Sequence, residues 1–260
     1  MIYKVDNKVN NKIKDKLSNI FKGMHDTCIL SALQGYMGTI WVDNVQDPMA
    51  AQIIVGDFVF YAGQSDLVEA KELLENLPNN SLVIVEDSKW KDKIENIYKG
   101  NIDKFQRYAF KKDVESLDIN KIESFISKLP KGYELKKVDF NIANSKSFNE
   151  LSEDFTAQFN SVEDFINRGT GYCIFHGEKV VSGATSYSIY NNGIEIEIDT
   201  HEEHRQKGLA TVVAAALILE CLKEGKYPSW DAANLNSVKL AKKLGYVLDK
   251  PYDTYYVNYK

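Results

Sequence analysis

Two histidines and a basic, glycine-containing run share the ten residues from His201 to Ala210, HEEHRQKGLA. Imidazoles ligate transition metals, whereas a basic loop with a glycine before a helix holds phosphate, so two chemistries are open for this segment. A helical zinc-protease motif needs histidines four residues apart, as in H-E-x-x-H. His201 and His204 are three apart, between a predicted strand and a predicted helix. We therefore predict two solvated loop histidines and no metal site.

The basic half of the segment has the features of a phosphate cradle. The first turn of a helix leaves backbone N–H groups unpaired, and that end of the helix carries a partial positive charge. Gly208 lets the backbone approach an anion closely, and Ala210 is nearly as small. Arg205 and Lys207 add positive charge at the rim. These residues predict a pyrophosphate site at the start of the helix.

Two common nucleotide-binding motifs are absent. The chain contains no G-x-x-x-x-G-K-S/T sequence, which excludes a Walker loop. Gly169-Thr170-Gly171 is a fragment that lacks the third glycine of G-x-G-x-x-G. The predicted pyrophosphate loop is therefore of another type.

The composition is that of a soluble globular protein, with 260 residues, 44% hydrophobic and 27% charged. The net charge of −5 argues against nucleic acid as a partner and is compatible with a cationic amine. The three cysteines, Cys28, Cys173 and Cys221, form no C-x-x-C pair, so we expect them to be packed and reduced. No apolar run is long enough for a bilayer, and the first residues lack the apolar segment of a signal peptide. We expect a cytoplasmic protein with no membrane partner.

The pattern of elements predicts an α/β protein of two domains, 1–130 and 131–260, divided near Pro130-Lys131-Gly132. The second domain is expected to run strand, two helices, three strands, helix, strand, helix and two strands. Its third strand before the long helix is GIEIEIDT, residues 193–200, and that helix covers roughly 207–224. The first domain has a similar order of strands and helices, which suggests a diverged internal duplication.

Two motifs carry a resemblance to a known family. Arg205, Gly208 and Ala210 fill the fixed places of Q/R-x-x-G-x-G/A, which lies between a strand and a helix. Asn234 is followed three residues later by the small residue Ser237, and then by the LGF-like ending Leu244-Gly245-Tyr246. The C-terminal half resembles the GNAT superfamily of acetyl-CoA-dependent N-acyltransferases. Within it, the segment from Glu195 to Tyr246 is similar to the zwittermicin A resistance-type bacterial acetyltransferases.

This resemblance implies a fold and a set of cofactor contacts. The fold would be a central mixed, mostly antiparallel, splayed sheet flanked by helices, with the N-terminal domain as a degenerate copy that has no CoA site. The CoA pyrophosphate would be held after Arg205 by the backbone amides of Gln206, Lys207, Gly208, Leu209, Ala210 and Thr211. The pantetheine arm would pair with the strand edge at Ile198, Asp199 and Thr200, as in strand addition. Asn234 and Ser237 would line the far side of the splay, and their alternative role is plain helix capping.

The implied reaction is attack of an amine on the thioester of acetyl-CoA, which needs a base. Strand alternation places Glu195, Glu197 and Asp199 on one face, and we favour Glu195 or Glu197 as the base. The alternative is a carboxylate row on a solvated face, and Asp231 is a third candidate. Many relatives have a tyrosine four residues after the small helix-opening residue, where this chain has Ala241.

We therefore expect a cytoplasmic N-acetyltransferase that acetylates the amine of a small molecule, such as an antibiotic, with acetyl-CoA as co-substrate. The alternative is a catalytically weak GNAT-fold module that binds an acyl-CoA or another ligand, since the residue at 241 is not tyrosine. Neither function involves nucleic acid, and both are compatible with a homodimer.

Overall fold

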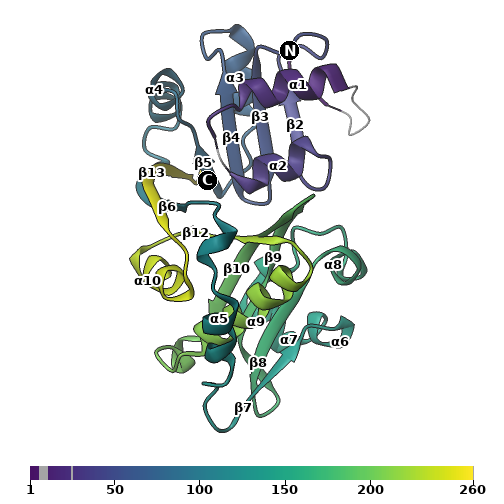
Figure 1. Cartoon of the computed structure of the whole chain (residues 1–260). Helices are drawn as coiled ribbons and strands as arrows, with labels where there is room; N and C mark the ends of the chain where they lie inside the picture. The colour runs from purple at the N-terminus through teal and green to yellow at the C-terminus, as the bar shows by residue number, and fades with distance from the viewer. Residues whose placement is uncertain (6–10, 25, 260) are drawn as a thin grey trace. The chain divides into compact units, whose positions relative to one another are not determined.

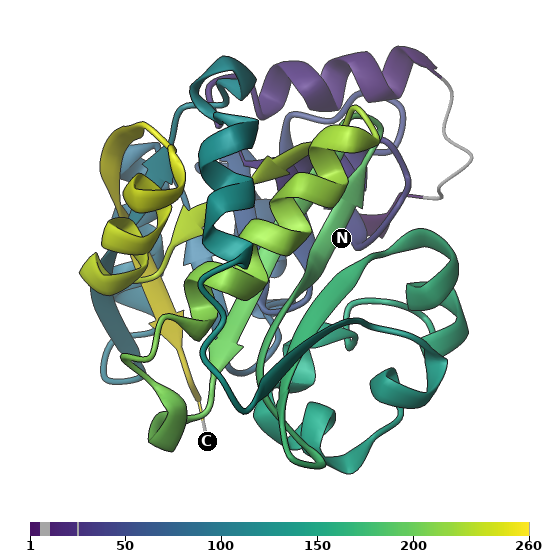
Figure 2. The ribbon, with the colours of Figure 1, turned by 60° about the horizontal axis from the view of Figure 1, so that its bottom comes forward.

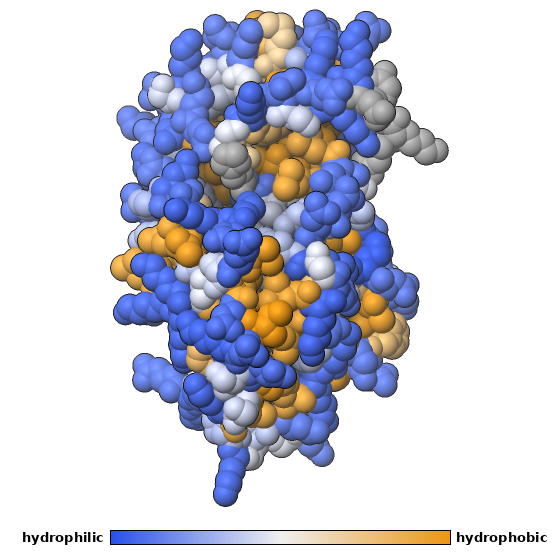
Figure 3. All heavy atoms as spheres, in the orientation of Figure 1, coloured by the Kyte–Doolittle hydropathy of each residue, from blue (hydrophilic) through white to orange (hydrophobic). Residues whose placement is uncertain are grey.

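The structure is a computed structural model that describes residues 1–5, 11–24 and 26–259, and it divides into two compact units. Unit 1 comprises Met1–Arg107 and Tyr252–Lys260, and unit 2 comprises Tyr108–Pro251. No helix in the described residues is long and apolar enough to cross a membrane. Most of the face seen in Figure 3 is hydrophilic, with an apolar patch over β10 of unit 2.

Unit 1 is a sheet with helices packed against it (Figure 1). Strand order in the sheet is β1-β2-β3-β4-β5, and the end of β13 follows β5. β1 to β4 are antiparallel neighbours, whereas β4 and β5 are parallel. The elements are β1 (Tyr3–Lys4), α1 (Asn11–Ile20), α2 (Thr27–Leu33), β2 (Thr39–Val42), β3 (Ala50–Val55), β4 (Phe58–Gly63), α3 (Val68–Glu75), β5 (Ser81–Ile84), α4 (Ser88–Ile97) and β6 (Ile102–Phe110).

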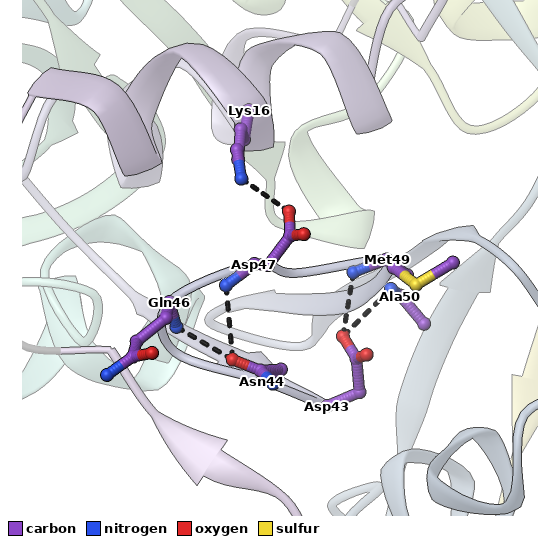
Figure 4. Close-up of polar contacts among 7 residues, drawn as sticks. All are labelled: Lys16, Asp43, Asn44, Gln46, Asp47, Met49 and Ala50. Atoms are coloured by element: carbon purple, nitrogen blue, oxygen red, sulfur yellow. Dashed lines mark hydrogen bonds and ion pairs between the residues drawn. The ribbon is translucent and has the colours of Figure 1, made fainter.

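The loop between β2 and β3 is held by two short polar side chains (Figure 4). Asp43 Oδ1 accepts hydrogen bonds from the backbone N–H groups of Met49 (2.9 Å) and Ala50 (3.0 Å). Asn44 Oδ1 accepts from the N–H groups of Gln46 (2.8 Å) and Asp47. Aspartate and asparagine form such turns because their side-chain oxygens reach the backbone a few residues ahead. The loop thereby sets the pairing of β2 with β3.

Replacing Asp43 by alanine should destabilise unit 1 by about 2 kcal/mol, because two backbone donors lose a charged acceptor. Gln46→Ala is the matched control, since only the backbone of Gln46 takes part, and it should change stability by less than about 0.5 kcal/mol. Urea unfolding followed by tryptophan fluorescence measures both, because Trp41 and Trp90 lie in unit 1. Equal effects of the two substitutions would contradict this account of the loop.

Unit 2 is built on a five-stranded sheet of order β11-β10-β9-β8-β7. The pairs β7–β8, β8–β9 and β9–β10 are antiparallel and β10–β11 is parallel, so the prediction of a mixed, mostly antiparallel sheet is confirmed. The strands of unit 2 are β7 (Tyr133–Lys137), β8 (Gly171–His176), β9 (Lys179–Tyr190), β10 (Gly193–Thr200), β11 (Tyr227–Ser229), β12 (Asp231–Ala232) and the start of β13 (Leu248–Val257). Its helices are α5 (Ile119–Ile126), α6 (Phe140–Ala143), α7 (Lys146–Leu151), α8 (Val162–Arg168), α9 (Leu209–Lys223) and α10 (Leu235–Leu244). Three 3₁₀ turns lie at Val114–Ser116, Glu153–Phe155 and Glu202–His204.

Helix α9 is the core of unit 2. Residues on almost every side of it are buried, which an apolar helix requires when it is covered by a sheet and by other helices. Figure 2 shows α5 and α9 side by side, and both contribute to one apolar cluster with α10. From α5 this cluster takes Ile122 and Phe125, from α9 it takes Ile218, and from α10 Val238. Because α5 packs on α9, the segment 108–130 belongs with unit 2, whereas we predicted a boundary near residue 130.

The last strand also differs from the prediction. We expected two final strands around GYVLD and TYYVNY, and the structure has one, β13 (Leu248–Val257). Tyr255 to Val257 of β13 pair with β5 of unit 1, and their inward side chains Tyr255 and Val257 are fully buried there. Burial of aromatic and β-branched residues therefore assigns the end of the chain to unit 1 rather than to the C-terminal domain.

The two units repeat one pairing scheme. In each, four antiparallel strands in sequence order are followed by a helix and by a strand parallel to the fourth. The fourth and fifth strands are β4 and β5 in unit 1, and β10 and β11 in unit 2. The similar order of elements that the sequence suggested is present in the fold.

Candidate functional site

The connection from β10 to α9 places a left-handed turn at the start of the most buried helix of unit 2. Gln206 has φ of 63° and Gly208, the N-cap residue of α9, has φ of 82°. A left-handed conformation is costly for glutamine and free of cost for glycine, which explains a glycine at the second position. A Cβ added at Gly208 would meet no atom within 4 Å, so this turn faces open space.

Several backbone amides of this turn have no acceptor in the protein. Within residues 11–24 and 26–259, no acceptor is found for the N–H groups from Gln206 to Ala210. The N–H of Thr211 donates to the carbonyl of Gly208 at 3.1 Å, so the predicted set of amides is shortened by one residue. No side chain caps the helix, and its first turn contains no acidic residue. Five adjacent N–H donors therefore lie at the positive end of α9, where an anion is favoured.

The basic side chains of the loop fold back onto it. Arg205 Nε donates to the carbonyl of Thr200 at 2.9 Å, and Lys207 Nζ donates to the carbonyl of Glu203 at 2.9 Å. Arg205 Nη2 lies 3.8 Å from Asp199 Oδ1. Each side chain thus braces the backbone and leaves its positive charge at the surface, where it favours an anion.

Beside the loop, the sheet opens between β10 and β11. The two strands pair only from Gly193 to Glu195, with Tyr227 to Ser229 as partners. A β-bulge in the β9–β10 pairing follows between Glu195 and Ile196. In the described part of the chain, the β11-side edge of β10 has no strand partner beyond Glu195, which includes Ile198, Asp199 and Thr200. This is the splay that the resemblance implied.

Asn234 and Ser237 have structural partners. Asn234 is the N-cap of α10, and its Oδ1 accepts from the N–H groups of Asn236 and Ser237, both at 3.0 Å. Ser237 Oγ accepts from the indole Nε1 of Trp230 at 3.1 Å. The helix-capping interpretation is confirmed for Asn234.

The carboxylates of β10 differ in burial. Glu195 is only 9% exposed and lies where the pairing with β11 ends, whereas Glu197 and Asp199 are half-buried. Burial raises the pKa of Tyr190 and Tyr227, and the nearby Glu195 carboxylate raises it further. The same glutamate adds to the raised pKa of the fully buried Tyr246. Glu195 therefore does not belong to a solvated carboxylate row, which was the alternative for this strand.

Two polar residues near Glu195 were not predicted from the sequence. Lys112 Nζ donates to Ser229 Oγ at 3.1 Å, and Ser229 stands opposite Glu195 in the parallel register. Neighbours in register project to the same face of a sheet. Lys112 and Ser229 are 117 residues apart, and neither belongs to a motif, so no sequence signal links them.

Other expectations for single residues are confirmed. Tyr246 is buried and its hydroxyl donates to the carbonyl of Pro228 at 2.6 Å, which is a packing role. Cys173 and Cys221 are buried free thiols, and burial raises the pKa of each to about 12, which keeps them protonated and unreactive. Asp231, the third candidate base, is half-buried in β12.

The histidines are less solvated than predicted. His201 is exposed, but His204 is half-buried, and its Nδ1 lies 2.9 Å from the hydroxyl of Tyr133. Ligand atoms of His201, Glu203 and His204 lie within 4.8 Å of one another. The ring of His176 lies 5.0 Å from that of His204. The spacing rule for a helical zinc motif, on which we predicted no metal site, did not reveal this group, because a 3₁₀ turn rather than an α-helix positions its residues.

The equivalent connection in unit 1 is closed. Gly63, at the end of β4, also has positive φ (87°), but a Cβ there would lie 2.1 Å from the carbonyl oxygen of Met49. The Gly63 carbonyl accepts from Nε1 of the fully buried Trp90 at 2.9 Å. Leu67, an apolar residue, precedes α3 and packs on the core. The start of α3 therefore differs from that of α9, which has a left-handed glycine as its N-cap residue.

Comparisons with known proteins agree with this fold. A family model for GNAT acetyltransferases matches residues 18–255. A crystal structure of a GCN5-related N-acetyltransferase-like protein from Streptococcus suis 89/1591 is 39% identical, with a TM-score of 0.88 over 95% of this chain and 99% of that one.

The uncharacterized N-acetyltransferase YdfB of Bacillus subtilis (strain 168) is 36% identical over 170 residues, which are 64% of this chain and 62% of that protein. A tandem GNAT protein from the clavulanic acid biosynthesis pathway shares the fold, with a TM-score of 0.57 at 9% identity over 99% of this chain and 98% of that one. The family match spans both units, and the open cradle and the splayed sheet lie within it. The chain belongs to the GNAT acetyltransferase family.

Proposed function

We propose that unit 2 binds acetyl-CoA and transfers its acetyl group to the amine of a small molecule. The observation that carries this proposal is a set of five amides, from Gln206 to Ala210, that have no acceptor among the described residues and lie beside an unpaired strand edge. Pyrophosphate is the part of CoA that such amides suit, since it carries several acceptor oxygens and negative charge. Arg205 and Lys207 add attraction from the surface of the loop.

The free edge of β10 suits the pantetheine arm. That arm contains amide groups, and a strand edge with exposed N–H and C=O groups pairs with such a chain. Ile198, Asp199 and Thr200 occupy this edge, between the cradle and the point where β10 meets β11. Asn234 and Ser237, at the start of α10, are proposed to border the arm on the β11 side. The thioester then lies near Glu195.

Direct attack on the thioester carbonyl forms a C–N bond and breaks the C–S bond. A base must accept a proton from the amine, because a protonated amine has no lone pair for attack. Glu195 is the favoured base and Glu197 the second candidate, with Asp231 as a third. Burial of Glu195 at the point of divergence supports this order. The carboxylates of β10 also favour a cationic acceptor, in line with the net charge of −5.

The departing thiolate needs a proton, and Ala241 cannot supply one. Ser229 is proposed as the donor, because its Oγ accepts from the Lys112 ammonium at 3.1 Å. A cation beside the hydroxyl oxygen favours release of the hydroxyl proton. The acid and the base then stand opposite each other on adjacent strands.

The acceptor is proposed to be a small, positively charged amine in the cytoplasm. The proposed resemblance of residues 195–246 to zwittermicin A resistance-type enzymes makes antibiotics with free amines the first compounds to assay. A turnover assay on such a panel also separates the alternative: tight CoA binding with no thiol release on any amine would favour a binding module.

The cradle is tested by Gly208→Asp, with Gly225→Asp as the matched control. Gly225 lies just past the other end of α9, also has positive φ (68°), and also faces open space, so both variants carry similar backbone strain. A carboxylate at residue 208 repels the pyrophosphate, and acetyl-CoA affinity measured by calorimetry should fall at least about tenfold. Gly225→Asp should bind normally. Normal binding by Gly208→Asp would remove the cradle from the proposal.

The base is tested by Glu195→Gln and Glu197→Gln in a thiol-release assay. Loss of the general base should lower kcat about 10²-fold to 10⁴-fold while leaving acetyl-CoA affinity unchanged. The variant with the larger loss identifies the base, and we expect it to be Glu195→Gln. Glu178→Gln, in the exposed β8–β9 turn, is the control. If neither β10 variant loses tenfold, the base lies elsewhere.

The acid is tested by a double-mutant cycle of Ser229→Ala and Lys112→Met. Each single change should lower kcat about tenfold, and the double variant should be no slower, because Lys112 acts through Ser229. Lys111→Met is the control. The hydrogen bonds of Lys111 are made by its backbone, which accepts from the Tyr227 hydroxyl and donates to the carbonyl of Val247. Additive losses would show that Lys112 and Ser229 act independently, against this assignment.

A further inference from the structure

The 3₁₀ turn before the cradle carries donor groups that the proposed acetyl transfer does not use. His201, Glu203 and His204 present ligand atoms that all lie within 4.8 Å of one another. Two imidazoles and one carboxylate form a donor set that zinc enzymes use, with a fourth position left for water. In the described residues, this is the group whose geometry could hold a metal ion.

Hydrogen bonds within the turn fix the backbone from which the three side chains extend. The N–H of His204 donates to the carbonyl of His201 at 2.8 Å, and the N–H of Arg205 donates to that of Glu202 at 3.2 Å. Lys207 Nζ donates a hydrogen bond to the carbonyl of Glu203 at 2.9 Å. Ligand atoms around a tetrahedral zinc ion are about 3.3 Å apart, so the side chains must close by at most about 1.5 Å. His201 and Glu203 are exposed and can rotate that far.

His204 has the outer partner that metal-binding histidines usually have. Its Nδ1 lies 2.9 Å from the hydroxyl of Tyr133, and when Nδ1–H donates to that hydroxyl, Nε2 has the lone pair that can ligate. Such a hydrogen bond fixes the ring orientation and tautomer. Tyr133 begins β7 and His176 ends β8, and their rings lie 4.9 Å apart in a tilted arrangement. The ring of His204 contacts both, at 5.7 Å from Tyr133 and 5.0 Å from His176.

We propose that His201, Glu203 and His204 form a surface site for one divalent transition-metal ion, such as Zn²⁺ or Ni²⁺, on the turn that leads into the cofactor cradle. Imidazole nitrogen selects these ions over Mg²⁺ and Ca²⁺, which prefer sets of oxygen ligands. Thiolates do not compete, because the free cysteines Cys28, Cys173 and Cys221 are all buried. The expected stoichiometry is one ion per chain.

The test is calorimetric titration of the full chain, without a polyhistidine tag, with ZnCl₂ and separately with NiCl₂ at pH 7.5. One ion should bind per chain, and an equal concentration of MgCl₂ should give no heat of binding. His201→Gln and Glu203→Gln should each weaken zinc binding at least about tenfold, and Tyr133→Phe should weaken it about tenfold. All variants should melt normally without metal, since His201 and Glu203 are exposed.

Glu202→Gln is the matched control. Glu202 is an exposed carboxylate on the same 3₁₀ turn as Glu203, but it lies outside the ligand group. Its replacement should change zinc affinity less than about twofold. The proposal is overturned if zinc does not bind, or if Glu202→Gln weakens binding as much as Glu203→Gln does. The second result would mean that zinc is attracted only by the general charge of the turn.

Discussion

The candidate site depends on one constraint: helix α9 is buried along most of its length, and the residue before it, Gly208, lies at the surface. Helix α9 is apolar almost throughout, so its position is fixed by the sheet and by α5 and α10. Among the described residues its first N–H groups have no acceptor, because a helix cannot satisfy them itself. Gly208, in a left-handed conformation that glycine adopts without strain, precedes them and faces open space. The proposed pyrophosphate site depends on this arrangement.

The two units share one pairing scheme but differ at the turn that follows the fourth strand. Both place a glycine of positive φ at or after the fourth strand, Gly63 in unit 1 and Gly208 in unit 2. At Gly63 the space is taken by the carbonyl of Met49 and by hydrogen bonding to Trp90, whereas at Gly208 it is open. The two glycines also differ in place, because Gly63 ends β4, whereas Gly208 is the N-cap residue of α9 and Leu67 is that of α3. Unit 1 instead takes the last strand of the chain into its sheet.

Polar side chains from distant parts of the chain meet where β10 and β11 diverge. Parallel pairing aligns Glu195 with Ser229 on one face, and the stretch after β6 brings Lys112 to the serine. The pairing ends there because β11 is only three residues long. The short strand therefore both opens the edge of β10 and sets the place where buried polar side chains gather.

The sequence by itself determined the local features: the alternation of β10, the helix after Arg205, the glycine at its start, and the family motif. Each depends on residues within a few positions of one another, so spacing and propensity are sufficient. Only the tertiary structure decided which distant groups meet. It placed Lys112 on Ser229, Tyr133 on His204, and residues 108–130 and 252–260 with units other than those predicted. Some of these contacts join segments more than 100 residues apart, such as Lys112 with Ser229 and β13 with β5, and they are selected by packing of buried surface, which no local pattern encodes.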